Sequence, residues 1–316
     1  MEHKRIVITD FGSVDVMALQ VASTSLPKEG EVLIKVSFAS VNPIDVKTRA
    51  GLGWAAAHNK DHLPWVPGYD LSGQVVSCGA NTSYFKVGDK VAGCIGFPFR
   101  GGSYSQCVCV PEAEVIQVPS SISLESAAAL PLAGLTALQA LQKANLIAGD
   151  RVLILGGAGG GGHFAIQIAV AHQAEVFATC RANNIDFINS LGASALNYQS
   201  SSVSECVGNI DVLIDLVGGD TALAALPCLA PNARVITLPT LSAEFVCEHA
   251  KKLGFTAHGM LFEPERKQLQ QLLDMLQRGE MKTEIQQIYS MYDVSYAHKQ
   301  VESGRTRGKV LLDMEC

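Results

Sequence analysis

Residues 156–162, GGAGGGG, are the stretch whose composition and spacing point most directly to chemistry. Four consecutive apolar residues at 152–155 precede them, a pattern typical of a strand buried on both faces. Apolar and small residues then recur at helical spacing from about His163. A strand, a glycine turn and a helix bind diphosphates, because glycines let the backbone approach the phosphates and the helix N-terminus offers free N–H groups and a favourable dipole. We therefore predict a dinucleotide site rather than a flexible linker, which would lack the flanking strand and helix.

The end of the following strand indicates which dinucleotide binds. A protein that prefers NAD places Asp or Glu there, roughly 20 residues after the glycine turn, to bind the ribose hydroxyls. Residues 178–184, ATCRANN, contain no acid, but they do contain Thr179 and Arg181. An arginine pairs with the 2′-phosphate of NADPH through charge-assisted hydrogen bonds, whereas a carboxylate would repel it. The sequence therefore favours NADPH, and the alternative is that Arg181 is a solvated surface residue.

Two kinds of pattern divide the chain into the elements that must position these residues. Short strand-like runs punctuated by Gly and Pro indicate a mostly β, partly open barrel, at 4–9, 31–40, 71–76, 90–94 and 105–110. Alternating strands and helices then indicate a doubly wound parallel sheet of the Rossmann type, with strands at 152–155, 175–179, 211–216, 234–238 and 256–259 and helices from about 163 and at 185–191.

The remaining segments connect or complete these two parts. A helical run at 123–144 has Ser123 as its expected N-cap and is interrupted at Pro131 and Gly134. Further along the chain, an amphipathic helix is predicted at 265–278 and a last strand at 309–313. We expect the chain from about Phe262 to return to the first domain, so the expected domains are 1–122 with 263–316, and 123–262.

Composition disfavours several classes of protein. The 316 residues are 48% hydrophobic, which is enough for two domains with their own cores. A formal net charge of −6 disfavours nucleic acid as the main ligand. No apolar signal region and no run approaching the ~20 apolar residues that cross a bilayer are found, so we expect a cytoplasmic protein without a membrane partner. Nine cysteines, an odd number without disulfide-like spacing, agree with a reducing compartment.

Five segments together resemble one protein family almost from end to end. They are VNPIDVKTRAG at 41–51, VPGYDLSGQV at 66–75, AAALPLAGLTALQAL at 127–141, IDLVGGDT at 214–221 and ESGRTRGKVLL at 302–312. They are similar to the zinc-free quinone oxidoreductases of the medium-chain dehydrogenase/reductase superfamily, the group that includes zeta-crystallin. The resemblance implies an α/β fold in which a GroES-like catalytic domain is wrapped around a Rossmann domain. It also implies a cleft between the domains, NADPH as hydride donor, and a homodimer joined along the edges of the nucleotide-binding sheets.

The resemblance also suggests catalytic positions. Asn42 occupies a position near the nicotinamide, where its amide could donate to a developing oxyanion, and the alternative is a structural role in the turn before Pro43. Asp45 stands at the acidic position of the family, with Lys47 as a possible partner. Relatives often have tyrosines where this chain has Lys47 and Gly53. Because glycine has no side chain to donate a proton, reduction of enoyl thioesters is disfavoured.

A catalytic metal is not expected. Zinc-dependent members of the superfamily carry Cys and a His-Glu pair where this chain has Asn42 and Tyr69-Asp70, so the thiolate and imidazole that would bind the zinc are missing. Two other pairs lack a third and fourth ligand nearby, namely Cys107 with Cys109 and His58 with His62. Four aromatic residues are candidates either for an acceptor pocket or for the core, namely Trp54, Trp65, Phe97 and Phe99.

Cofactor contacts are assigned to the glycine turn and to positions implied by the resemblance. They are Thr136, Gly156, Gly159, Gly160, Gly161, Gly162, Thr179, Arg181, Tyr198, Val217, Leu238, Thr240, Met260, Phe262 and Lys309. Tyr198 matches a tyrosine beside the 2′-phosphate in NADPH-dependent relatives. The expected function is metal-free hydride transfer from NADPH to a quinone or an α,β-unsaturated carbonyl compound. The alternative is an NADPH-binding protein with little turnover, as in relatives that are structural lens proteins or bind RNA, although the acidic net charge disfavours RNA.

Overall fold

The computed structural model describes residues 2–200 and 202–315. Its contacts divide the chain into two compact units. Unit 1 comprises Met1–Ala133, Pro264–Gly279 and Ile285–Cys316, and unit 2 comprises Gly134–Glu263 and Glu280–Glu284. Both the Rossmann sheet and the mostly β unit that the sequence predicted are present, so the predicted fold class is confirmed.

The boundaries of the two units differ from the expected domain boundaries by several residues. Residues 123–133 belong to unit 1, because Ala128 and Ala129 of the first helix in this run pack against Leu311. Residues 280–284 belong to unit 2, because the Gln167 side chain exchanges two hydrogen bonds with the backbone of Lys282, at 2.9 and 3.0 Å.

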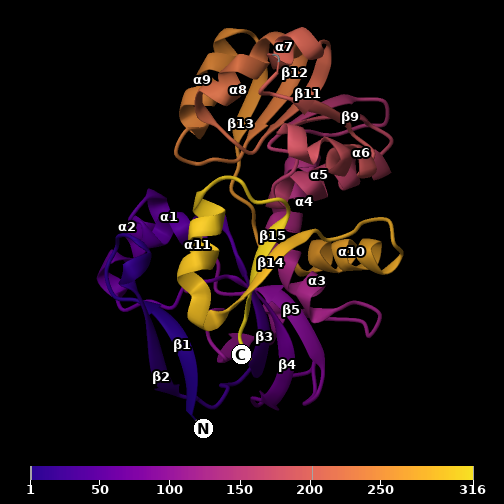
Figure 1. The fold of residues 1–316 in the computed structure, drawn as a ribbon. Coiled ribbons are helices and arrows are strands. Elements are labelled where there is room, and N and C mark those ends of the chain that lie inside the picture. Colours follow the sequence, from indigo (N-terminus) through magenta and orange to yellow (C-terminus); the bar gives the residue numbers. More distant parts are fainter. Residues whose placement is uncertain (1, 201, 316) are drawn as a thin grey trace. The chain divides into compact units, whose positions relative to one another are not determined.

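Unit 2 is built on a parallel sheet whose described strands follow the order β10-β9-β8-β11-β12-β13 (Figure 1). Its elements are β8 (Arg151–Leu155), α5 (Gly160–Ala171), β9 (Glu175–Cys180), α6 (Ile185–Ser190), β10 (Ser194–Asn197), α7 (Val203–Cys206), β11 (Ile210–Asp215), α8 (Gly219–Ala225), β12 (Leu229–Thr237), α9 (Ala243–Lys252) and β13 (Thr256–Gly259). On one face of the sheet, Leu213 and Val235 form a cluster with Val246 of α9. The intervening residues, such as Ile214 and Ile236, point to the opposite face and are buried too, as expected when helices cover both faces.

Unit 1 contains a second, mostly antiparallel sheet of the order β14-β15-β3-β4-β5-β7, in which β6 also pairs with β3. The described elements are β1 (Glu2–Ile8), β2 (Met17–Ser23), β3 (Glu31–Val41), α1 (Pro43–Arg49), α2 (Gly53–Asn59), β4 (Asp70–Cys78), β5 (Lys90–Cys94), β6 (Cys107–Pro111), β7 (Val115–Gln117), α3 (Leu124–Ala129), α10 (Arg266–Gln277), β14 (Ile285–Ser290), α11 (Val294–Glu302) and β15 (Lys309–Asp313). Strands β1 and β2 form a separate antiparallel pair. Helix α4 (Pro131–Lys143) begins in unit 1 and continues into unit 2.

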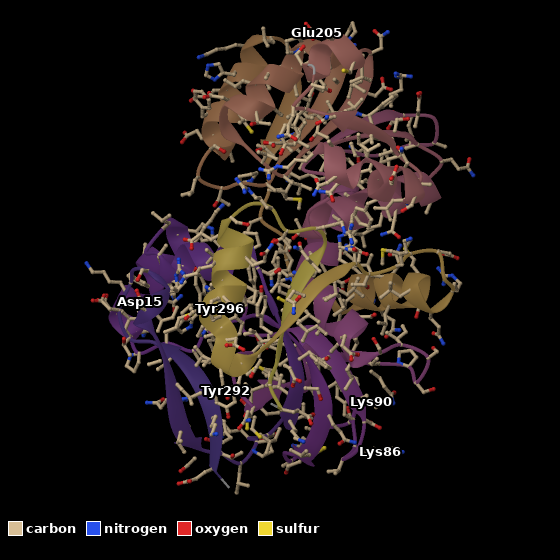
Figure 2. All side chains as sticks on the ribbon, in the orientation of Figure 1. Asp15, Lys86, Lys90, Glu205, Tyr292 and Tyr296 are labelled. Carbon is tan, nitrogen blue, oxygen red and sulfur yellow. The ribbon has the colours of Figure 1, made fainter. Side chains whose placement is uncertain are left out.

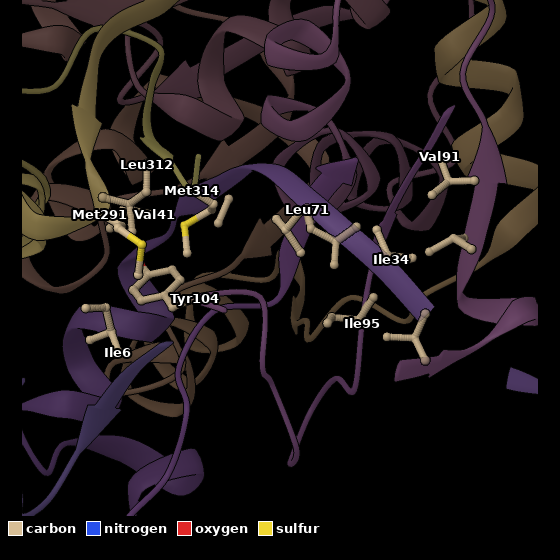
Figure 3. Packing of buried hydrophobic residues seen from close by; sticks show 14 of the residues in the cluster. Ile6, Ile34, Val41, Leu71, Val91, Ile95, Tyr104, Met291, Leu312 and Met314 are labelled. Atoms are coloured by element: carbon tan, nitrogen blue, oxygen red, sulfur yellow. The ribbon is translucent and has the colours of Figure 1, made fainter. Parts of the chain in front are cut away.

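The core of unit 1 forms where inward-facing residues of several strands meet (Figure 3). Ile34 of β3, Leu71 of β4 and Leu312 of β15 are fully buried in it. Tyr104 and Met291 from connecting segments complete this cluster. Asp70 begins β4, Lys309 begins β15 and Asn42 directly follows β3, so this packing fixes the positions of three polar residues.

Two details of the helices differ from the sequence prediction. The run at 123–144 is interrupted at Pro131 but not at Gly134, which lies inside α4. Helix α5 begins at Gly160 rather than near His163, because Gly159 serves as the N-cap and the following glycines adopt helical conformation. Within the described part of the chain, no helix is both long and apolar enough to span a membrane.

Candidate functional site

The carboxyl ends of the parallel strands in unit 2 collect most of the residues that were assigned to the cofactor. They are Gly156 and Gly159–Gly162 after β8, Thr179 and Arg181 at the end of β9, Tyr198 after β10, Val217 after β11, Leu238 and Thr240 after β12, and Met260 and Phe262 after β13. Adjacent strands of the sheet run in the same direction, so these residues share one edge. Open α/β sheets bind ligands at this edge, at the point where the strand order reverses, which is here between β8 and β11.

Glycines shape the turn after β8 in ways that no larger residue could replace. Gly156 has φ of 76°, in the left-handed region that favours glycine. A Cβ on Gly162 would lie only 2.3 Å from the carbonyl oxygen of Gly156. The Gly156 N–H donates to the Thr179 hydroxyl at 2.9 Å, and the Gly157 N–H donates to the Thr179 carbonyl at 3.0 Å. Thr179 therefore holds the turn against β9, a role that the sequence alone did not reveal.

Helix α5 presents its N-terminus at this turn. Its N-cap is Gly159, whose carbonyl accepts the His163 N–H at 3.1 Å. The N–H groups of the first turn, from Gly160 to Gly162, precede the first intrahelical donor and so are available for an anion. The arrangement fits a diphosphate, because it combines free N–H groups, a favourable helix dipole and side-chain-free space.

Arg181 and Tyr198 are brought together although they lie on different strands. The Arg181 Nε donates to the Tyr198 hydroxyl at 2.7 Å. Tyr198 is 47% exposed, so the pair stands at the surface of the carboxyl edge. No acid accompanies it in the turn that follows β9. The pair therefore offers a guanidinium and a hydroxyl to a phosphate.

The loop after β11 is fixed by a buried carboxylate that the sequence analysis did not single out. Asp215 accepts the N–H groups of Val217 and Gly218 at 2.9 and 2.7 Å. Its second oxygen accepts the Thr237 hydroxyl of the neighbouring strand at 2.7 Å. Val217 thereby projects from a fixed backbone and is 48% exposed. Asp215 is thus a positioning residue for this edge.

Two of the assigned cofactor residues do not follow strands of this parallel sheet. Thr136 lies within α4, and Lys309 lies in β15 of unit 1. Lys309 is buried and donates to the Asn42 Oδ1 at 2.5 Å. It also lies 4.0 Å from a carboxylate oxygen of Asp70. The structure therefore groups Lys309 with the candidate catalytic residues of unit 1.

Asn42, Asp70 and Lys309 form the centre of a buried polar cluster. The Asn42 Nδ2 donates to Asp70 at 2.9 Å, while its Oδ1 accepts from Lys309. Only this orientation of the amide offers an acceptor to the ammonium and a donor to the carboxylate. The other Asp70 oxygen accepts the Leu132 N–H at 2.9 Å, at the start of α4. Asp70 thus ties β4 to β15, to the start of α1 and to α4.

The Asn42 amide, for which the sequence left open a role as donor to an oxyanion or a structural role in the turn before Pro43, is paired on both sides. Asn42 is 1% exposed, and its Nδ2 is occupied by Asp70 and, at 3.4 Å, by the Ser40 carbonyl. The residue is the N-cap of α1, directly before Pro43. The charged groups on either side fix this orientation, because a carboxylate and an ammonium orient the amide more strongly than neutral partners do. These contacts fit the structural alternative, and the role of Asn42 toward an acceptor stays a prediction.

Asp45 is the second acid of this cluster. Its Oδ2 accepts the Asn42 N–H at 2.8 Å and so caps α1. Burial raises the pKa of Asp45 to about 7, with Asp70 raising it further and the Asn42 amide and Lys309 lowering it. Burial also raises the pKa of Asp70 to about 6, although Lys309 and Asn42 lower it. The two carboxyl groups thus titrate near neutral pH.

The four candidate aromatic residues of unit 1 differ in burial. Trp65 is buried, and its Nε1 donates to the Arg100 carbonyl at 2.6 Å. Trp54, by contrast, is only partly buried and meets Phe97 and Phe99 edge-on, with ring centroids 6.2 Å apart in both pairs. Core packing therefore accounts for Trp65, and the other three remain candidates for an acceptor surface.

The residues considered as metal ligands do not form a site. His58 stacks on Phe99 with centroids 3.8 Å apart, and both His58 and His62 are exposed. Across the described residues, no three His, Cys, Asp or Glu side chains form a group that could hold a metal ion. Asp70 was considered only as part of the zinc position, so the sequence analysis missed its central place, for which the Tyr69-Asp70 match was the available signal.

These features define an α/β protein with a dinucleotide-binding sheet and a mostly β second unit. Residues 28–120 match the family model described as the alcohol dehydrogenase GroES-like domain, and residues 191–312 match the zinc-binding dehydrogenase model. The chain belongs to the medium-chain dehydrogenase/reductase superfamily and, within it, to the quinone oxidoreductases. It is an oxidoreductase with a nicotinamide cofactor.

Individual relatives extend this result. A solved structure, the quinone oxidoreductase from Coxiella burnetii, has a TM-score of 0.96 and 37% sequence identity, over 99% of both chains. The mitochondrial NAD(P)H oxidoreductase RTN4IP1 of Danio rerio is 32% identical over 98% of this chain and 90% of its own length. The 2-methylene-furan-3-one reductase of Solanum lycopersicum is 33% identical over 98% of this chain and 79% of its own length.

Proposed function

We propose that the protein transfers a hydride from NADPH to quinones or α,β-unsaturated carbonyl compounds. The observation that carries the choice of cofactor is the hydrogen-bonded pair of Arg181 and Tyr198, without an acid in the turn that follows β9. The acceptor classes are supported by similarity to a quinone oxidoreductase and to a furanone reductase.

When bound, the reduced nicotinamide supplies the hydride. The glycine turn and the N-terminus of α5 hold the diphosphate, and Arg181 pairs with the 2′-phosphate. Quinones and enones are already electrophilic, and the anion that hydride transfer leaves on them is delocalised. Holding donor and acceptor together can therefore supply most of the catalysis. The partly exposed rings of Trp54, Phe97 and Phe99 are the surface that we assign to a planar acceptor.

The choice of cofactor is tested by kcat/KM with NADPH and with NADH. We expect a preference for NADPH in the natural protein. Arg181→Ala should raise KM for NADPH and leave KM for NADH nearly unchanged, because only NADPH carries the 2′-phosphate. Tyr198→Phe is the matched control that keeps the ring and removes the hydroxyl, and it should have the same effect to a smaller degree. A preference for NADH in the natural protein would overturn the assignment.

The acceptor is tested by NADPH oxidation with a panel of quinones and enones. Turnover with either class supports an enzyme of the proposed kind. NADPH binding without turnover on the whole panel would instead support a binding protein. We favour turnover, because the polar cluster of Asp45, Asp70 and Lys309 keeps three buried ionisable groups near one another, a common feature of active sites.

Two further proposals concern the setting of the protein. We propose a homodimer formed along β13, because this strand ends the sheet and would otherwise leave one row of backbone groups without strand partners. Light scattering at micromolar concentration tests it, and a monomeric mass would contradict it. We also propose a cytoplasmic location without a nucleic-acid partner, tested by cell fractionation and by binding to labelled RNA.

A further inference from the structure

Helices α1 and α11 of unit 1 pack against each other, and polar residues of both helices lie where they meet. Asp45, Thr48 and Arg49 lie three and four positions apart on α1, so they share one face. Helix α11 packs against α1 and carries His298 and Glu302, which are also four positions apart. The Arg49 Nη2 donates to Glu302 at 2.9 Å and joins the two faces. We call these five residues the α1–α11 seam.

The seam leads from the interior to the surface of unit 1. Asp45, Thr48 and His298 are fully buried, and the Arg49 side chain is 1% exposed. Glu302 at the outer end is 47% exposed. On the side of α11 that faces solvent, Tyr296 is 61% exposed (Figure 2), which shows that the helix turns His298 inward.

Several polar atoms of the seam have no partner in the described part of the chain. They are Asp45 Oδ1, Thr48 Oγ1, Arg49 Nε and Nη1, and His298 Nδ1. A buried polar group that is left unpaired destabilises the folded state, and a charged group does so most strongly. A set of this size in a folded protein therefore implies that something pairs these atoms.

The chemistry of the set identifies water as that partner. A bound anion would face the Asp45 carboxyl group, and a bound cation would face the Arg49 guanidinium. Water donates and accepts, so it can serve the Arg49 N–H groups, the Thr48 hydroxyl and the Asp45 oxygen together. The Tyr104 hydroxyl lies 3.2 Å from His298 Nε2 and fixes one side of the imidazole, which leaves Nδ1 for the seam.

We propose that the α1–α11 seam holds internal water and gives the buried Asp45 carboxyl group proton exchange with solvent at Glu302. In that exchange the Asp45 O–H bond breaks, its electron pair stays on the carboxylate, and a solvent proton forms the bond again. His298 is neutral, because burial and Arg49 lower its pKa to about 3, so its imidazole can accept at one nitrogen and donate at the other. The other ionisable groups that act on Asp45 are Asp70 of β4 and Lys309 of β15.

The catalytic use of this exchange rests on the proposed function. Reduction by one hydride consumes one proton: the acceptor gains two electrons and one hydrogen from NADPH, NADPH becomes NADP⁺, and a proton completes the reduced acceptor. The seam would return a proton to Asp45 after each turnover that draws on it. Asp45 is here a proton store, and the residues between it and Glu302 are positioning residues for water.

The test follows hydrogen–deuterium exchange of buried carboxyl groups by infrared spectroscopy, in the full chain without acceptor. At a pD below the pKa of Asp45, transfer to D₂O shifts the carboxylic C=O band, and Asp45→Asn identifies the band of Asp45. In the natural protein we expect exchange within the mixing time. Thr48→Val keeps the shape of threonine but removes its hydroxyl, and should slow exchange by about tenfold or more.

Matched variants and a second measurement make the outcome decisive. Thr48→Ser keeps the hydroxyl and should exchange like the natural protein, whereas His298→Phe should slow exchange as Thr48→Val does. Equal rates in Thr48→Val, His298→Phe and the natural protein would overturn the proposal, as would a high-resolution crystal structure with no water in the seam. Because exchange is measured without acceptor, a failed acceptor panel would count against the proposed function and leave this result standing.

Discussion

The carboxyl edge of unit 2 and the polar cluster of unit 1 are built from different materials. At the edge, backbone N–H groups are assigned to the diphosphate, and glycines make them accessible after β8. In the cluster, the side chains of Asn42, Asp70 and Lys309 hold one another, and all three are buried. A site made of backbone groups requires the absence of side chains within one short segment. A site made of side chains requires residues that are distant in the sequence to meet in the fold.

The largest effect is expected from a substitution at Gly162, in the glycine turn of the carboxyl edge. A Cβ there would lie 2.3 Å from the Gly156 carbonyl oxygen and 2.7 Å from the Gly157 Cα, and backbone cannot move aside cheaply. Gly162→Val should therefore prevent unit 2 from folding or abolish NADPH binding. A thermal shift assay with and without NADPH measures both effects.

Gly159→Val separates folding from binding at the same turn. The nearest atom to its Cβ would be the Gly156 carbonyl oxygen at 3.3 Å, so the protein without cofactor has nearly enough room. We expect this variant to melt close to the natural protein but to lose the NADPH-induced shift, because the side chain fills the space of the diphosphate. An NADPH-induced shift that survives in both variants would show that the diphosphate binds elsewhere.

The second prediction concerns the loss of one charge from the polar cluster of unit 1. Lys309→Met leaves the Asp70 carboxyl group buried without its cation, and removing one partner of a buried pair costs about 3–5 kcal/mol. Urea denaturation should show a loss of this size. The double variant Lys309→Met/Asp70→Asn removes both charges and lets the Asn42 amide rotate. It should therefore regain most of the lost free energy of unfolding. A single variant as stable as the natural protein would mean that Lys309 contributes no charge to the cluster.

The same contrast explains how much of the fold could be predicted from the sequence. Strands 256–259 and 309–313 have the bounds that the sequence predicted, and continuous apolar runs such as 152–155 mark the buried strands. Strands β10 and β14 were missed, because they lie at sheet edges and half of their positions are polar. The short helices α1 and α2 were missed too, since seven residues give too little periodicity.

For the sites, the difference is one of distance along the chain. The glycine turn is contiguous, so its spacing alone indicated a diphosphate site. Arg181 and Tyr198 were found separately, through the missing acid and through the resemblance, and the structure joins them by a hydrogen bond. No spacing rule connects Asn42 with Asp70 and Lys309, which are 28 and 267 positions away. Their contacts arise only when β3, β4 and β15 pair in one sheet.

The third prediction concerns the pH dependence of stability in the cluster. The pKa of Asp45 is raised to about 7, against about 3.9 in an unfolded chain. Between these values the folded state holds a proton that the unfolded chain has lost, so this contribution to stability is full at low pH and is lost as pH rises toward about 7. The loss is at most about 1.4 kcal/mol for each pKa unit of the shift.

Asp45→Asn should remove this loss, because an amide does not titrate and can still accept the Asn42 N–H. Denaturation of both proteins across this pH window measures the difference. We expect the variant to gain stability relative to the natural protein as pH rises. A difference that does not change with pH would show that Asp45 keeps an ordinary pKa.

The smallest expected effect concerns Gly161 in the glycine turn. Gly161 lies in the first turn of α5 without left-handed φ, and a Cβ there would meet Leu216 at 3.4 Å, an ordinary van der Waals contact. Glycine costs about 0.5–1 kcal/mol in entropy relative to alanine at such a position. Gly161→Val should therefore raise the melting temperature of the cofactor-free protein slightly and keep NADPH affinity within a few-fold. If it loses the NADPH-induced shift as completely as Gly159→Val, the glycines that contact phosphate must be reassigned.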